Sequence, residues 1–174
     1  MTNLRLFGFS CVLVFLIGPL WSQQQNAELR RLMDDVWAWQ LETDPILASE
    51  VGSDLYQDRL PDDSFESISQ RQHTLTGFLQ RLEEIDLPSD TAMGDHIDAA
   101  ILRLHLGDQA SRYRLRTHLM PINGREGFHV SFPQLAETMQ LESEADYRDY
   151  VSRLKAFGRY ADQQIALMHR GIDE

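Results

Sequence analysis

The chain has 174 residues, of which 43% are hydrophobic, so it is long enough for one domain with its own core but too short for two large domains. Its 27 acidic and 16 basic residues give a net charge of −11 at pH 7. Such a charge repels phosphate backbones and anionic headgroups, which argues against nucleic acid as a partner. The charge itself identifies no ligand, because an acidic surface also serves solubility.

The first 22 residues have the order of a secretory signal. Arg5 precedes an almost unbroken apolar run over residues 6–20, and Ser22 stands before a polar stretch. We expect cleavage after Ser22, which leaves residues 23–174 exported to the periplasm or secreted, with no further membrane contact. Leu20 is bulkier than the residue that signal peptidase prefers there, so an uncleaved membrane anchor remains an alternative.

Cys11 lies early in the apolar run and is the single cysteine of the chain. Its position argues against lipoprotein processing. Removal of residues 1–22 would leave a chain without thiol or disulfide, and the loss of Arg5 would change the net charge from −11 to −12. The stability of the mature chain must then come from packing.

After the signal, apolar residues recur at intervals of three and four, the period of a helix. A first helix is predicted over residues 27–42 with Asn26 as its cap. Its apolar residues, which include Trp37 and Trp39, span a wide arc, so more than one element should cover it. The pair Asp44-Pro45 predicts a short second helix that Gly52 ends.

Three further long helices are predicted. The first opens at a capping box formed by Asp63 and Glu66 and ends before residues 86–88. The next starts after Asp90 and frays near Gly107; its apolar positions are Met93, Ile97, Ala100, Ile101 and Leu104. The last runs from Ser143, which pairs with Asp146, to a C-cap at Gly171. The predicted fold is therefore an all-α, bundle-like array of about four long helices plus short ones, with one irregular loop at 119–133.

This loop concentrates polar groups, glycine and histidine between His118 and Pro133. Pro121 and Pro133 are predicted to mark its boundaries, and Asn123-Gly124 predicts a turn. We interpret the loop first as a packed connection. A second interpretation makes it the edge of a substrate cleft through Asn123, Arg125 and His129, and metal ligation is the third.

Elsewhere the residue chemistry predicts no catalytic, metal or cofactor site. His96 and His105 are nine residues apart and point to opposite sides of one helix, so they cannot share an ion there. Asp98 and His105 share a face, but seven residues separate them by on the order of 10 Å, too far for one zinc ion. The chain contains no His-Glu-x-x-His pair, glycine-rich phosphate loop or Gly-x-Ser-x-Gly elbow.

The order of several short motifs along the mature chain resembles a known family. The motifs are the helix that contains Trp37, Asp44-Pro45 with Gly52, residues 59–64, Arg81-Leu82 with Ile85-Asp86, residues 120–123 with 127–129, Asp146-Tyr147 with Arg153-Leu154, and Gly171-Ile172. Together they resemble the amino-terminal part of the bacterial family called domain of unknown function 885. The resemblance covers about residues 29–172.

This resemblance implies a longer, mainly helical, exported protein similar to zinc metallopeptidases, in which a His-Glu-x-x-His helix supplies two zinc ligands and a general base. That helix would lie downstream of residue 174, so zinc belongs only to the longer parent protein and no catalytic or ligand role is assigned here. The first functional hypothesis is a non-catalytic segment of a hydrolase, truncated before its metal site and partnered by the rest of the parent chain. The second is a free-standing exported helical module that binds a protein or peptide.

The predicted signal can be tested by expressing the whole chain in a bacterial host and measuring the mass and first residue of the product. We expect a chain that begins at Gln23. An intact Met1 on membrane-bound protein would instead indicate the uncleaved anchor.

Overall fold

The structure is a computed structural model that describes residues 26–125 and 127–174, so the predicted signal peptide lies outside the described residues. The elements are α1 (Ala27–Thr43), α2 (Pro45–Glu50), α3 (Phe65–Glu84), α4 (Met93–Arg114), the 3-10 turn η1 (Thr117–Leu119), α5 (Phe128–Thr138) and α6 (Glu144–Asp173). Within these ranges the β structure is a single isolated bridge between Ile122 and Gly127. The prediction of an all-α chain with four long helices is confirmed.

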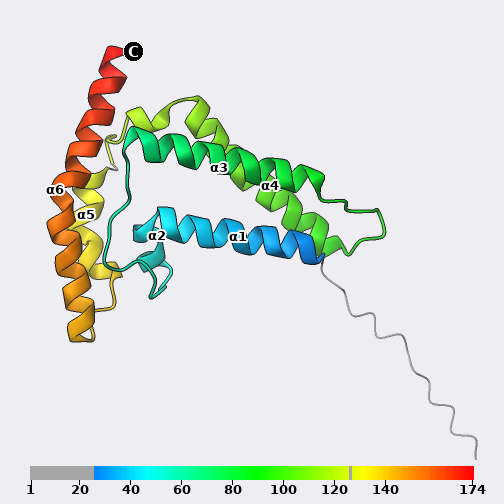
Figure 1. Cartoon of the computed structure of the whole chain (residues 1–174), viewed down its shortest axis with the longest axis horizontal. Helices are drawn as coiled ribbons and strands as arrows, with labels where there is room; N and C mark the ends of the chain where they lie inside the picture. Colours follow the sequence, from blue (N-terminus) through cyan, green and yellow to red (C-terminus); the bar gives the residue numbers. More distant parts are fainter. Residues whose placement is uncertain (1–25, 126) are drawn as a thin grey trace, which may run out of the picture.

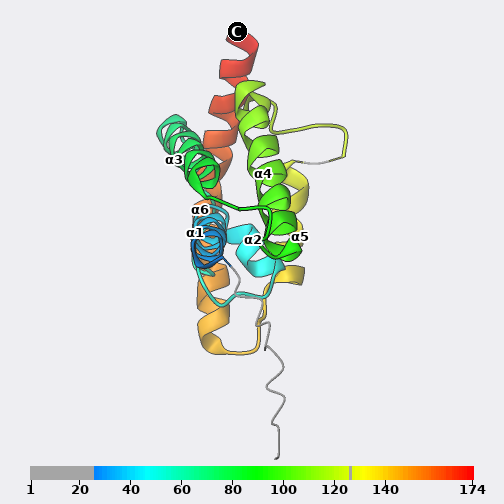
Figure 2. The ribbon, with the colours of Figure 1, turned by 90° about the vertical axis from the view of Figure 1, so that its right-hand side faces the viewer.

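Helices α1, α3 and α4 lie lengthwise beside one another, as Figure 1 shows. Figure 2 views α1 nearly end-on, with α3 and α4 to either side and α4 running obliquely to the other two. Their facing sides are closed by leucines and other apolar residues: Leu29, Leu32, Val36, Leu75, Phe78, Leu82, Ile85, Ala99, Leu102 and Leu106. Trp39 packs edge-on against Phe78 with ring centroids 5.4 Å apart. We call these three helices the three-helix group.

Helix α6 crosses one end of the three-helix group, with α5 beside it (Figure 1). At 1.5 Å per residue its 30 residues span about 45 Å. Phe132 of α5 stacks on Phe157 of α6 with centroids 4.0 Å apart. A second apolar cluster, centred on Leu60, Leu135, Met139 and Tyr160, fills the space between α2, α5 and α6.

The helix starts in the first third of the chain follow the local signals. The Asn26 side chain accepts from the backbone N–H groups of Glu28 and Leu29, and that of Asp44 accepts from Leu47 before Pro45 opens α2. Gly52 then takes φ +73°, a left-handed conformation that glycine adopts without strain. These three predictions are confirmed.

The start of α3 lies one residue later than predicted. Ser64, not Asp63, caps the helix and accepts from the N–H of Ser67. Asp63 is used elsewhere because its carboxylate pairs with Arg71 and accepts from Gln164 of α6. A tertiary interaction therefore displaces the local capping box.

Helix α4 differs most from its prediction. Its cap is Ala92 rather than Asp90, and the helix continues through Gly107 to Arg114. The apolar positions singled out in the sequence face outward, with Met93 70% and Leu104 76% exposed. The buried side is instead Asp95, Ala99, Leu102 and Leu106. Asp95 is buried because its carboxylate accepts from the backbone N–H of Asn26, the group that precedes α1.

The irregular loop is shorter than the predicted 119–133, because η1 includes residue 119 and α5 already begins at Phe128. Pro133 lies inside α5 and does not bound the loop. A proline there removes one backbone donor, and the stacking of Phe132 on Phe157 compensates by anchoring the helix.

Helix α6 starts as predicted, with Ser143 and Asp146 in a reciprocal capping box. The expected stop at Gly171 is wrong, since the helix runs to Asp173. A Cβ at Gly171 would lie 2.8 Å from the carbonyl oxygen of Leu119, so the glycine serves a close approach of α6 to η1.

Arg153 joins the two parts of the molecule. Its side chain is 0% exposed, yet the structure gives it no carboxylate partner among the described residues. Nε donates to the carbonyl of Arg59 at 2.9 Å and Nη1 to the Ser49 hydroxyl at 2.8 Å. Nη2 donates to the carbonyls of Pro45 and Tyr56. One guanidinium thus ties α6 to α2 and to the segment that follows it.

Replacing Arg153 with methionine should destabilise the chain by about 3 kcal/mol or more, because three backbone carbonyls and a hydroxyl lose their donor inside the protein. Urea unfolding followed by circular dichroism measures the change. Arg148→Met is the matched control, since that arginine is exposed on the same helix and should shift stability by less than about 0.5 kcal/mol. Equal effects of the two variants would show that the buried network is not what holds α6.

Candidate binding cleft

A cavity of about 610 Å³ opens where the three-helix group meets α6. Its lining combines apolar, aromatic and charged side chains from six of the described elements and from the segments between them. They include Trp39, Asp44, Ile46, Glu50, Asp63, Arg71, His105, Arg112, Tyr113, His118, Pro121, Tyr160, Gln164 and Leu167. This volume lies in the range of small-molecule and peptide-binding sites.

The sequence-predicted cleft edge lies apart from this lining. Asn123, Arg125 and His129 are all exposed, and none of them lines the cavity of about 610 Å³. The Asn123 side chain accepts from the N–H of Arg125 at 2.8 Å, as in the predicted turn. From the same stretch, His118 and Pro121 do line the cavity. A substrate contact through the three outer residues stays a prediction.

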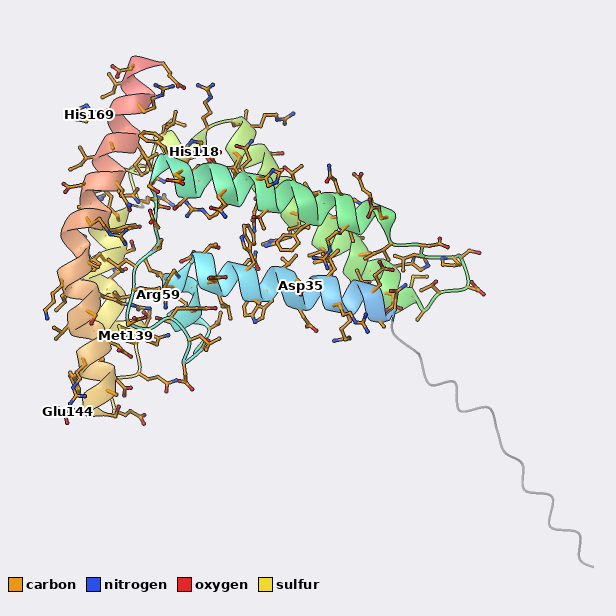
Figure 3. All side chains as sticks on the ribbon, viewed as in Figure 1. Asp35, Arg59, His118, Met139, Glu144 and His169 are labelled. Carbon is orange, nitrogen blue, oxygen red and sulfur yellow. The ribbon has the colours of Figure 1, made fainter. Side chains whose placement is uncertain are left out.

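His118 is carried by η1 and lies near the start of α3, as Figure 3 shows. The turn that holds it follows Arg116, whose φ of 55° reverses the chain after α4. Its ring is tilted against Tyr113 with centroids 6.1 Å apart. Burial, aided by the positive charges of Arg116 and Arg71, lowers the pKa of His118 below its ordinary value. The ring is therefore neutral at pH 7.

One ring nitrogen of His118 has no protein partner. Its Nδ1 is buried and makes no hydrogen bond with any of the described residues. A buried polar atom without a partner costs free energy of about 1–3 kcal/mol. A ligand that brings a hydrogen-bonding group to this nitrogen would recover that cost.

An ion pair forms the wall between α3 and α6. Arg71 Nη2 lies 2.7 Å from Asp63 Oδ1, and both side chains are largely shielded from solvent. The second carboxylate oxygen of Asp63 accepts from Gln164 Nε2 at 2.6 Å. Arg71 also donates to the carbonyl of Asp62. These contacts hold the charged groups in fixed positions along the cavity.

Two other ionisable groups of the lining have raised pKa values. Burial raises the pKa of the Asp44 carboxyl above its ordinary value, although its hydrogen bonds from the α2 backbone act in the opposite direction. Burial also raises the pKa of Tyr160, and the nearby charges of Asp63 and Asp44 add to this. Tyr160 thus stays a neutral phenol, which offers one donor and one acceptor.

At the rim of the cavity, His105 is held by two amides. Its Nε2 lies 2.5 Å from Gln40 Nε2 and 2.8 Å from Gln109 Nε2. The two glutamines come from α1 and α4, so the ring bridges these helices. Sequence reasoning considered His105 only as a zinc ligand with neighbours on its own helix, and the bridge to Gln40 depends on tertiary packing.

The described residues do not supply a metal site. No group of three or more His, Cys, Asp or Glu side chains within residues 26–125 and 127–174 lies close enough to hold an ion. What the cavity offers is hydrogen bonding: guanidinium donors, carboxylate acceptors, a phenol and an unpaired imidazole nitrogen beside an apolar wall. That combination suits binding of a polar ligand with apolar side groups.

The sequence model of a family described as bacterial protein of unknown function (DUF885) matches residues 45–174. Because the match covers more than half of the chain, the protein belongs to this family. The residues that line the cavity after position 45 fall inside the matched range. No curated protein and no solved structure matches the chain.

None of the helices in the described part of the chain combines the length and apolar character needed to cross a membrane.

Replacing Asp44 with asparagine should change how stability depends on pH. Because the folded-state pKa is raised, ionisation above the ordinary value of 3.8 favours the unfolded state, so the native protein loses stability as pH rises through the folded-state pKa. Asparagine keeps the helix cap but does not titrate. Relative to the native chain, the free energy of unfolding of Asp44→Asn should therefore increase as the pH rises from about 4 to neutral.

The control for this experiment is Asp146→Asn, which removes another helix-capping aspartate. Hydrogen bonds from Ser143 lower the pKa of Asp146, so its contribution is present above the ordinary pKa and is lost as pH falls. The difference in the free energy of unfolding between Asp146→Asn and the native chain should change with pH in the opposite direction. Urea unfolding at several pH values measures both, and parallel slopes for the two variants would contradict the assignment of Asp44.

Proposed function

We propose that this chain is a non-catalytic, helical amino-terminal part of an exported, zinc-dependent, peptidase-like hydrolase, and that its cavity binds a segment of the peptide substrate. Membership in the DUF885 family and the cavity beside α6 support this proposal. The zinc site and its catalytic residues would belong to a further part of the parent protein. The chain's other partner in this proposal is therefore the remainder of the parent chain.

The observation that carries the proposal is the buried, unpaired Nδ1 of His118 in the lining of the cavity. A peptide backbone presents N–H donors and carbonyl acceptors at short intervals. A neutral imidazole nitrogen without a proton accepts a hydrogen bond from such an N–H. The guanidinium of Arg71, which has only donors, would bind a peptide carbonyl. The apolar wall of Trp39, Ile46 and Leu167 accommodates side chains.

The zinc expected from the peptidase-like family does not fit the residues described here. Of the two histidines in the cavity lining, His105 is already hydrogen-bonded to two glutamines, and His118 offers one nitrogen without two further ligands. Structural and catalytic zinc sites use at least three protein ligands. In this proposal the described part of the chain contributes recognition, and the metal chemistry belongs to the rest of the parent protein.

The export part of the proposal is supported by residues 1–22, whose basic start, apolar run and small residue precede a polar stretch. The strong negative charge argues against a nucleic-acid role for the cavity.

A second candidate function is a free-standing exported binding module. The observation that favours it is the exposed apolar side of α4, formed by Met93, Ile97, Ile101 and Leu104. Contiguous apolar surface on a helix commonly marks a protein contact. The two candidates differ in whether zinc-dependent hydrolysis appears when the rest of a parent protein is present.

Peptide hydrolysis by the whole chain in the presence of added zinc tests the absence of catalysis. We expect no cleavage of a casein substrate, because no zinc site is formed by the described residues. Turnover that a chelator abolishes would overturn the proposal.

Peptide binding is tested by calorimetric titration of the whole chain with N-acetyl-trialanine amide, whose blocked ends leave only amides and methyl groups. Saturable binding is expected for the native chain. His118→Phe should abolish it while keeping or slightly raising stability, because the ring packing is retained and the unpaired nitrogen is removed. His73→Phe, an exposed position on α3, should bind as the native chain does. Binding that survives in His118→Phe would exclude the cavity as its site.

A further inference from the structure

Helix α6 carries a regular apolar pattern that the rest of the described chain does not use. Apolar or small residues recur at alternating intervals of four and three over almost the whole helix. They are Tyr147, Val151, Leu154, Gly158, Ala161, Ile165, Met168 and Ile172, and we call them the α6 seam. The seam spans 25 residue steps, or about 38 Å. This alternation is the heptad pattern of a coiled coil, sustained for more than three heptads.

Six of the eight seam residues are exposed, and the other two, Ala161 and Met168, are half-buried. Tyr147 is 55% and Ile172 80% exposed, and Val151, Leu154 and Ile165 are also exposed. A Cβ at Gly158 would meet no atom within 4 Å. The side of α6 that faces the protein is different: its buried residues are Arg153, Tyr160, Gln164 and Leu167, and Phe157 packs beside them. Figure 3 shows α6 at the outer edge of the molecule, with His169 pointing away from the three-helix group.

The core-facing side of α6 thus includes Arg153 and Gln164, while most of the apolar seam on its outer side is exposed to solvent. In a heptad assignment the seam residues occupy the a positions (Val151, Gly158, Ile165, Ile172) and the d positions (Tyr147, Leu154, Ala161, Met168). Such a seam is stable when a second helix inserts its own a and d residues between them.

We propose that the α6 seam is the interface of a homodimer in which the α6 helices of two copies pack antiparallel. In antiparallel pairs an a residue faces a d residue of the partner. With the two-fold axis between Gly158 and Ala161, one helix presents Val151 to the other copy's Met168, and Leu154 to Ile165. The outermost layers pair Tyr147 with Ile172. The interface is self-complementary, as a two-fold dimer requires.

Residue size is compatible with this register. The two small residues, Gly158 and Ala161, face each other at the centre, where the antiparallel helices approach most closely. Every layer outside the centre joins two large apolar side chains. A parallel pairing would bring the same four small residues together at the centre, so the orientation is decided by charge.

Charge supports it as well. Lys155 and Asp162 flank the seam at e positions. In the antiparallel register, Lys155 of one copy lies across from Asp162 of the other copy. The two-fold axis makes this pair twice. Within the described residues neither Lys155 nor Asp162 forms an ion pair, so both charges remain available for a partner. Opposite charges at such flanking positions set partner orientation.

The exposed apolar side of α4 lacks these properties. Its residues Met93, Ile97, Ile101 and Leu104 follow intervals of four, four and three over only about three turns. It therefore provides a matched control for exposed apolar surface without a heptad seam.

The experiment is to measure the mass in solution of the full chain and its variants by sedimentation equilibrium. Residues 1–25 are either kept in all of them or removed from all of them. The native chain is expected to be a dimer at micromolar concentration. Leu154→Glu places a charge in the seam and should give a folded monomer, with unchanged helix content by circular dichroism. Ile101→Glu on α4 should remain a dimer. A native chain that is monomeric up to millimolar concentration would overturn the proposal and assign the seam to another occupant.

A charge exchange tests the orientation without altering the apolar seam. Lys155→Glu should weaken the dimer by about tenfold, because two attractive pairs become repulsive. The double variant with Asp162→Lys added should restore native affinity. Failure of the second substitution to rescue the first would exclude this register.

Disulfide trapping gives an independent measurement. In a chain with Cys11→Ser, the pair Leu154→Cys and Ile165→Cys should form intermolecular disulfides, because the two positions face each other in the antiparallel register. Leu154→Cys alone should not, since its counterpart lies eleven residues, or about 16 Å, along the helix. Trapping by the single cysteine would instead demonstrate parallel packing and overturn the proposed interface.

Discussion

Arg153 places a charged group with five N–H donors at the contact of α6 with α2 and the segment that follows α2. Burial lowers its pKa, and the carboxylates of Asp58, Asp149 and Asp44 act against this without touching it. Guanidinium groups keep their charge in proteins, so the cost of burial has to be met by hydrogen bonds. The carbonyls of Pro45, Tyr56 and Arg59 accept these hydrogen bonds. The chain turns tightly there, which brings the three carbonyls to one guanidinium.

The rest of the site depends on that junction. With α6 fixed against α2, Gln164 reaches Asp63, and the ion pair between Asp63 and Arg71 becomes the wall of the cavity. Asp44 lines the same cavity, and desolvation by the surrounding protein raises the pKa of its carboxyl. A cavity of this kind is therefore a consequence of how two helical parts are joined, and neither part would form it alone.

Features that depend on a few neighbouring residues were predictable from the sequence. Asn26, Asp44 and the Ser143–Asp146 box act within four residues of the helix starts that they cap, so their patterns are sufficient. Features that depend on distant partners were not. Ser64 replaced Asp63 as a cap because Asp63 is held by residues 8 and 101 positions away.

The orientation of α4 and the place of the cleft belong to this second group. The apolar residues of α4 predicted its buried side wrongly, because Ala99, Leu102 and Leu106 allow closer packing against α1 and α3. His118 stood out in the sequence with His129, but only its position on η1 brings it to the cavity. No local pattern marks a ring nitrogen that will lack a partner after folding.

The contact between Gly171 and Leu119 has a mechanical consequence. Leu119 follows His118 directly, and Arg116 of the same turn forms an ion pair with Glu174 at the end of α6. The last turn of α6 is thus latched to the turn that carries the histidine. This end of the helix, far from its capping box, and the turn that carries the imidazole of the cavity are therefore held against each other. Helix α6 thus lines the cavity and also anchors the turn that carries His118.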